Sequence, residues 1–110
     1  MLFCIMANYT SQSINALMEH TESRQPAVQK LVEAAGGKLV SMYGTAMEGP
    51  GALVIIDVPD PSVAPAIAGV VMASGALKDI KFFRLLSQDE IVTVRKKAVE
   101  LRKAYTPPSK

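Results

Sequence analysis

The sequence predicts one α+β domain built around an antiparallel sheet, and three observations favour this class. Between Gly36 and Asp60, the runs 39–47 and 52–58, rich in Val, Ile and Tyr, flank the tight link Glu48-Gly-Pro-Gly51, which is typical of a hairpin. Helical patterns precede and follow this hairpin, and each of them lies between two strand patterns. The chain has 110 residues, of which 49% are hydrophobic, so it suits a single domain with its own core.

The first third of the chain is expected to form a strand and a broken helix. The stretch Leu2–Tyr9 is apolar at both odd and even positions, which indicates a strand covered on both faces. Thr10 is a natural N-cap for the helix that follows. A break is expected at 20–23, because Pro26 suits the first turn of a second helix capped by Ser23. This second helix carries a stripe of apolar residues, Val28, Leu31, Val32 and Ala35.

The part after the hairpin is expected to add a helix, a strand and a last helix. Asp60 caps the first of these helices, Pro61 takes its first position, and Gly75 ends it. The strand spans 77–86, and alternation along it places Phe82 and Phe83 on opposite faces. The capping box at 87–90 opens the last helix. Spacings of 3, 4, 3 and 4 predict a narrow a/d seam on that helix, formed by Ile91, Val94, Ala98, Leu101 and Tyr105.

The resulting order β-α-β-β-α-β is the ferredoxin-like arrangement. Right-handed crossovers then give an antiparallel sheet in the order 4-1-3-2 with helices on one face. Residues 1–105 are expected to form this domain with its C-terminal helix, and 106–110 a flexible tail. Since both faces of the sheet are apolar, we expect a second copy to pack on the bare face and enclose a cavity, which makes the protein a homodimer or a higher oligomer.

Composition excludes several classes of function. The net charge of +2 is too small to indicate nucleic-acid binding. No apolar run reaches the roughly 20 residues that span a bilayer, and the N-terminus does not have the pattern of a signal peptide, so a cytoplasmic protein without a membrane partner is expected. The single cysteine, Cys4, cannot form an intrachain disulfide, and it is interpreted as a buried, inert thiol.

Six short segments, in this order and spacing, resemble the GYD-domain family of the dimeric α+β barrel group. The segments are Asn8-Tyr9-Thr10, Ser23-Arg24, 33–37 (Glu-Ala-Ala-Gly-Gly), Tyr43, 57–60 (Asp-Val-Pro-Asp) and 82–87 (Phe-Phe-Arg-Leu-Leu-Ser). The resemblance covers residues 1 to about 91 and implies a dimeric α+β barrel of bacterial origin. The wider group includes cofactor-free oxygenases, isomerases, haem-handling enzymes and ligand binders, so the fold by itself specifies no chemistry.

The hairpin turn departs from the family signature. The Gly of the Gly-Tyr-Asp signature corresponds to Gly49, but Gly51 and Ala52 stand where the Tyr and the Asp are expected. The aromatic ring and the carboxylate that the family places there cannot be assigned to this chain.

The polar residues that could line an inter-sheet cavity are Asn8, His20, Tyr43, Asp57 and Arg84. Arg84 lies in an apolar strand and needs an anionic partner if it is buried, either Asp57 in a structural ion pair or an anionic ligand. His20 is the only histidine, and it is interpreted first as an exposed residue at a helix end. No metal-binding spacing is present, and no cofactor is expected.

Two functions from different classes follow. The favoured hypothesis is an oligomeric ligand-binding or assembly module that uses its apolar sheet face, with a small apolar ligand as a possible partner. The alternative is a cofactor-free enzyme of the monooxygenase or isomerase type that acts on a small apolar or aromatic molecule. Haem or metal handling would depend on His20 alone.

Overall fold

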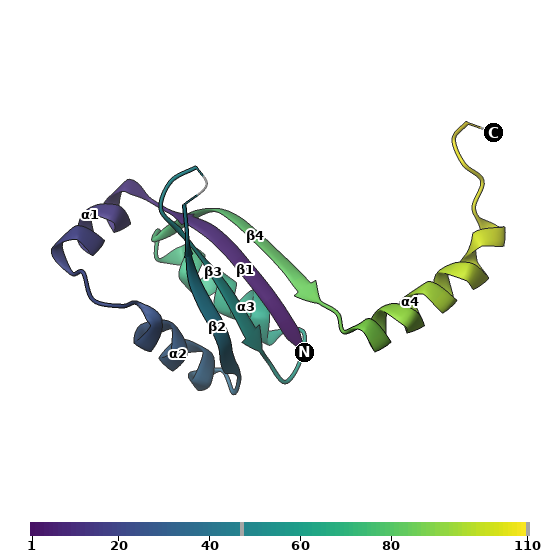
Figure 1. The fold of residues 1–110 in the computed structure, drawn as a ribbon, viewed down its shortest axis with the longest axis horizontal. Helices are drawn as coiled ribbons and strands as arrows, with labels where there is room; N and C mark the ends of the chain where they lie inside the picture. Colours follow the sequence, from purple (N-terminus) through teal and green to yellow (C-terminus); the bar gives the residue numbers. More distant parts are fainter. Residues whose placement is uncertain (47, 110) are drawn as a thin grey trace.

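A four-stranded antiparallel sheet forms the centre of the computed structural model, which describes residues 1–46 and 48–109 (Figure 1). Its strands are β1 (Leu2–Tyr9), β2 (Lys38–Thr45), β3 (Gly51–Asp57) and β4 (Leu77–Leu85). They are arranged in the order β2-β3-β1-β4, and every neighbouring pair is antiparallel. The predicted ferredoxin-like order 4-1-3-2 is therefore confirmed.

Local sequence signals explain where the helices begin. The helices are α1 (Ser11–Glu19), α2 (Gln25–Ala34), α3 (Val63–Ala73) and α4 (Gln88–Leu101). The Thr10 hydroxyl accepts a hydrogen bond from the Ser13 backbone N–H at the start of α1. At the start of α4, Ser87 and Glu90 form both hydrogen bonds of the predicted capping box.

The helix break predicted at 20–23 is confirmed, whereas two predicted helix starts are slightly wrong. Arg24, not Ser23, is the N-cap of α2, although the Ser23 hydroxyl accepts a hydrogen bond from the Gln25 N–H. Asp60 and Pro61 precede α3 instead of starting it. The Asp60 carboxylate accepts hydrogen bonds from the hydroxyl and backbone N–H of Ser62, and these bonds lower the pKa of Asp60.

The hydrophobic core lies between the sheet and the helices that cover one of its faces. Ile56 of β3 is fully buried, and Val32 of α2 and Ala64 of α3 pack in the same cluster. Phe3 of β1 belongs to this cluster as well, and its ring stacks on Phe82 of β4 with centroids 5.3 Å apart. The prediction that the helices α1 to α3 share one face of the sheet is confirmed.

Helix α4 projects away from the sheet at the end of β4 (Figure 1). Within α4 only Ile91 is partly buried. The radius of gyration is 17.7 Å, against about 13 Å for a compact domain of this size. The predicted seam is shorter than expected, because the α-helix ends at Leu101 and Tyr105 lies after a short 3-10 turn. Similarly, the second strand was expected to run to residue 47, but β2 ends at Thr45 and residue 47 lies outside the described residues.

Candidate functional site

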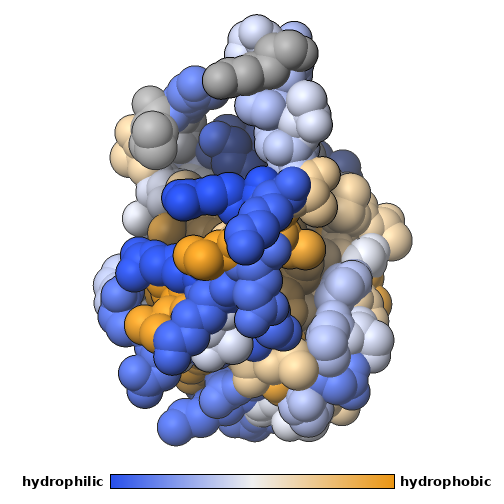
Figure 2. Space-filling view, turned by 90° about the vertical axis from the view of Figure 1, so that its right-hand side faces the viewer, coloured by the Kyte–Doolittle hydropathy of each residue, from blue (hydrophilic) through white to orange (hydrophobic). Residues whose placement is uncertain are grey.

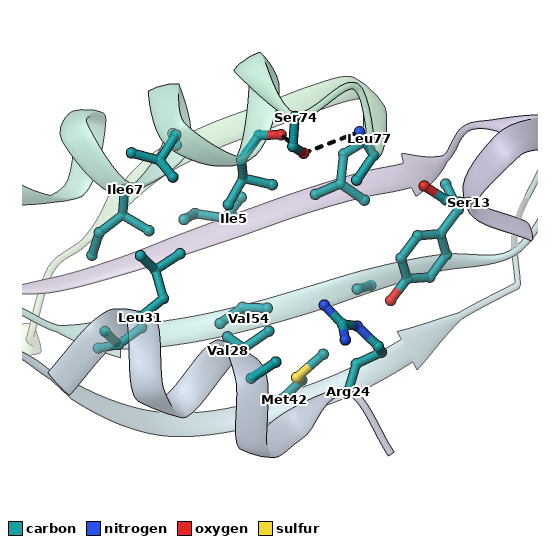
Figure 3. Close-up of a pocket in the computed structure, with 18 of the residues that line it drawn as sticks. Ile5, Ser13, Arg24, Val28, Leu31, Met42, Val54, Ile67, Ser74 and Leu77 are labelled. Carbon is teal, nitrogen blue, oxygen red and sulfur yellow. Dashed lines mark hydrogen bonds between the residues drawn. The ribbon is translucent and has the colours of Figure 1, made fainter. Parts of the chain in front are cut away.

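An apolar groove lies on the helix-covered side of the sheet, between the α1–α2 segment and α3 (Figure 3). We name it the helix-side groove. Its cavity volume is about 590 Å³, which falls within the usual range of small-molecule sites, roughly 300–1,000 Å³. Its floor consists of strand residues and its walls of helix residues, chiefly Ile5, Met42 and Val54 below and Val28, Leu31, Ile67 and Val71 at the sides.

The groove exists because the helices cover opposite edges of the sheet. Helix α2 packs mainly against β2, and α3 lies against β4. The central strands β1 and β3 therefore present Ile5 and Val54 to the space between the helices, and both side chains are only half-buried. A groove floored by aliphatic side chains favours an apolar occupant, because covering them removes apolar surface from water.

One end of the groove carries polar side chains. In Figure 3, Ser13 and Arg24 lie toward one end, whereas Leu31 and Ile67 lie toward the other. Tyr9, His20 and Glu22 also line this site, and none of the three forms a side-chain hydrogen bond or ion pair within the described residues.

The opposite side of the sheet, which we name the open face, carries none of the helices formed by residues 1–46 and 48–109. The strand register places Cys4 of β1 between Ile55 of β3 and Phe83 of β4 on this face. Phe83 remains 43% exposed, and Tyr43 of β2 remains 62% exposed. The other apolar residues of the open face are Leu2, Met6, Leu53 and Leu85.

Three of the five predicted site residues lie on the open face but do not converge. Tyr43 pairs with Leu53 in the sheet, and Asn8 donates a long hydrogen bond of 3.5 Å from its amide nitrogen to the Asp79 carboxylate. Asp57 is paired with Leu2, six residues along β1 from Asn8, so about 20 Å separates Asn8 from Asp57 along the strand. These residues cannot contact one small molecule together.

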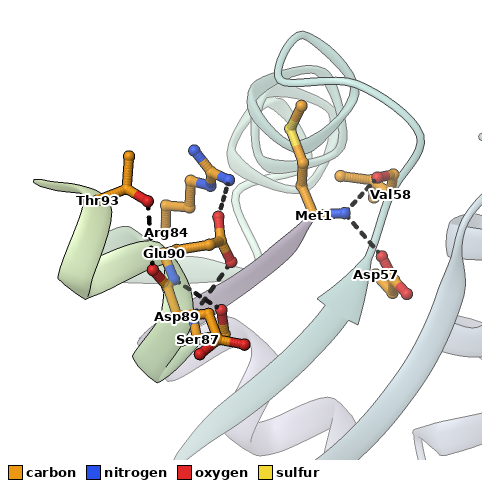
Figure 4. Close-up of polar contacts among 8 residues, drawn as sticks. All are labelled: Met1, Asp57, Val58, Arg84, Ser87, Asp89, Glu90 and Thr93. Atoms are coloured by element: carbon orange, nitrogen blue, oxygen red, sulfur yellow. Dashed lines mark hydrogen bonds and ion pairs between the residues drawn. The ribbon is translucent and has the colours of Figure 1, made fainter.

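The predicted pairing of Arg84 with Asp57 is wrong (Figure 4). An Arg84 guanidinium nitrogen lies 2.6 Å from a carboxylate oxygen of Glu90, at the start of α4. Asp57 instead accepts a hydrogen bond of 2.9 Å from the N-terminal ammonium of Met1. Arg84 is paired with Phe3 and shares its helix-covered side. It lies near the end of the edge strand β4, where α4 departs, and both partners of its ion pair are exposed.

The Glu90 carboxylate joins this ion pair to the capping box. Its pKa lies below the ordinary value, mainly because it accepts a hydrogen bond from the Ser87 backbone N–H and also because of the Arg84 charge. The interaction therefore holds the start of α4 to the end of β4, which is a structural role.

His20 lies at the C-terminal end of α1, as the simplest interpretation predicted, and it also lines the helix-side groove. Its side chain is exposed. Among residues 1–46 and 48–109, no three His, Cys, Asp or Glu side chains form a possible metal site.

Cys4 is 4% exposed although no helix covers it, because the cross-strand neighbours Ile55 and Phe83 shield its small side chain. Burial raises the pKa of the Cys4 thiol. A thiol with a raised pKa is a poor nucleophile, so this geometry agrees with the interpretation of Cys4 as inert.

Sequence reasoning missed the helix-side groove, together with Tyr9, Ser13 and Arg24 as residues that line it. The composition of helix α3 could have pointed to the groove. This helix is apolar nearly all round, so packing on the sheet leaves further apolar side chains that a ligand or partner could cover. Val70 and Met72 of α3 remain 60% and 56% exposed.

The fold and the groove define a ferredoxin-like α+β domain with an apolar small-molecule-sized cavity. The GYD domain family matches residues 3–94, and the chain belongs to this family. The match includes the sheet except Leu2 and the three helices beside it, and it ends within α4. A comparison with curated proteins finds no match. Among the described residues, no helix has both the length and the apolarity needed to cross a membrane.

Proposed function

We propose that the protein is a homo-oligomeric binding or assembly module in which a second copy covers the open face. The observation that carries this proposal is the apolar character of a sheet face that none of the helices covers. Exposed apolar surface of this kind marks an interface in soluble proteins. Two copies related by a two-fold axis would bring the same face of each sheet together, in the arrangement of a dimeric α+β barrel.

Helix α4 would enlarge the surface that the open face offers to a second copy. Four strands of about eight residues cover roughly 19 Å by 25 Å, which is about 480 Å² in projection. A stable dimer usually buries about 800 Å² on each partner. Helix α4 is about 21 Å long and adds an apolar stripe beside the sheet.

The surface of α4 supports this role. Val94 and Leu101 belong to the predicted seam and are 49% and 68% exposed. Val92 and Val99 are also exposed, but they lie on another side of the helix, beyond Arg95. Figure 2 views the molecule from the side of α4 and shows hydrophobic side chains at the surface among hydrophilic ones. An isolated helix of 14 residues gains little stability from its own hydrogen bonds, so its apolar stripe is best explained by a partner.

Light scattering coupled to size-exclusion chromatography tests the proposal. The expected result is a dimer or a larger species at micromolar concentration. Val94→Asp on α4 should weaken the assembly, whereas Thr93→Asp, on the polar side of the same helix, should leave it intact. A folded monomer at all concentrations would refute the proposal.

A second candidate function is a cofactor-free enzyme that acts on a small apolar or aromatic molecule. The helix-side groove favours it, because Tyr9, Ser13 and His20 line an apolar cavity. Binding without chemistry is better supported, because within the described residues no side-chain hydrogen bond joins Ser13 to His20, so no general base activates the Ser13 hydroxyl. Dioxygen uptake with reduced aromatic compounds would test the enzyme hypothesis, and turnover that His20→Ala abolishes would favour it.

A further inference from the structure

The helix-side groove has a polar end and an apolar end, and this polarity indicates the chemistry of its ligand. The apolar part of the floor follows β3 from Ala52 to Ile56, a length of about 14 Å. Val28 and Leu31 of α2 form one wall, and Ile67 of α3 forms the other. An extended aliphatic chain fits this shape better than a broad ring system, because the groove is long and lies between two helices (Figure 3).

The polar end is rich in hydrogen-bond donors. Arg24 carries a guanidinium group that forms no ion pair within the described residues. The Ser13 hydroxyl oxygen lies 3.2 Å from the Thr10 hydroxyl oxygen, and the one hydrogen of Thr10 also has the Gly75 carbonyl oxygen as an acceptor at 3.0 Å. Ser13 therefore turns its own hydrogen either to Thr10 or to a ligand. The Tyr9 hydroxyl offers another donor. Such a set matches an acceptor with a negative charge.

We propose that the helix-side groove binds a long-chain carboxylate of the fatty-acid class. The carboxylate accepts hydrogen bonds from Arg24 and Ser13, and the tail lies over Ile5 and Val54 toward Ile67. Glu22 lines the same site, and its charge opposes carboxylate binding more strongly the closer it lies to the bound carboxylate. The site lies on the side of the sheet opposite the open face.

Isothermal titration calorimetry of the full chain with three matched probes tests the proposal. The probes are dodecanoate, dodecanol and dodecylamine, each below the concentration at which it forms micelles. Dodecanoate should bind most tightly, and decanoate should bind about 15-fold more weakly, because two fewer CH₂ groups are buried. Tighter binding of dodecylamine would overturn the proposal, because Glu22 would then determine the charge preference. Absence of binding by all probes would also overturn it.

Two substitutions locate the ends of the ligand. Arg24→Gln should weaken dodecanoate about tenfold and leave dodecanol unchanged, whereas Arg95→Gln on α4 should change neither. Ala27→Trp should fill the groove and abolish binding of every probe, because Ala27 lines the groove. Since Ala27 is exposed, the substitution should leave the fold intact, which circular dichroism checks. Unchanged dodecanoate affinity in either Arg24→Gln or Ala27→Trp would overturn the proposal.

A second copy of α4 is the competing occupant of the groove. Val94→Asp disrupts the apolar stripe of α4 without touching the groove. The expected dodecanoate affinity of this variant is that of the unmodified chain. A clear gain in affinity would overturn the proposal, because it would mean that α4 fills the groove in the assembled protein.

Discussion

Phe83→Ala is expected to weaken the proposed dimer by about three orders of magnitude. Phe83 lies on the open face and is 43% exposed in one chain. A Phe side chain buries about 200 Å² when fully covered, so a partner would remove about 90 Å² from water. At about 25 cal/mol per Å², this is about 2 kcal/mol in each copy and about 4 kcal/mol in a two-fold dimer. Each 1.4 kcal/mol changes the dissociation constant tenfold.

Sedimentation velocity over a range of concentrations measures this effect, and the neighbouring residue provides the control. Phe82 points to the opposite side of the sheet, where its ring stacks on Phe3. Phe82→Ala should therefore lower the free energy of unfolding and leave the dissociation constant nearly unchanged. Equal effects of the two substitutions on dissociation, or a monomeric unmodified chain, would refute the reasoning.

Three further predictions concern the sheet, the thiol and α4. Gly51→Ala should lower the free energy of unfolding by about 1–3 kcal/mol in a denaturant titration, because a Cβ there would collide with the Ala7 carbonyl oxygen, whereas Gly44→Ala has ordinary contacts and should change little. Cys4 should react slowly with a disulfide reagent at pH 8 in the native protein and rapidly in urea, and equal rates would contradict its burial. The lowered pKa of Glu90 means that its stabilising contribution is present above the ordinary carboxyl pKa of 4.5 and is lost as the pH falls through the lowered pKa. The unmodified chain should therefore lose more helix content in acid, measured by circular dichroism, than the Glu90→Gln variant does. The variant has no carboxyl group at position 90 that could take up a proton.

Local patterns in the sequence were sufficient for the elements and their order. The Thr10 cap, the capping box of Ser87 and Glu90, and the hairpin up to Gly51 depend on residues within a few positions of one another. The alternation along β4 also assigned Phe82 and Phe83 to opposite faces correctly, because side chains alternate along any strand.

The partners of charged residues could not be read from the sequence. Arg84 was expected near Asp57, yet it pairs with Glu90, because the chain turns into α4 directly after β4. Asp57 instead meets the N-terminus of β1, which lies beside the end of β3 in the antiparallel pair. Such pairings depend on which chain ends meet in space, and short-range patterns do not contain that information.

The sequence by itself determined that this chain forms a ferredoxin-like sheet with one apolar face free of helices. Only the tertiary structure decided where a ligand could bind, because the helix-side groove depends on how far apart α2 and α3 lie over β1 and β3. Helix periodicity identifies the buried stripe of each helix, such as Val28 and Leu31, but not the distance to the next helix. That distance follows from packing against strands at opposite edges of the sheet, which is a property of the whole fold.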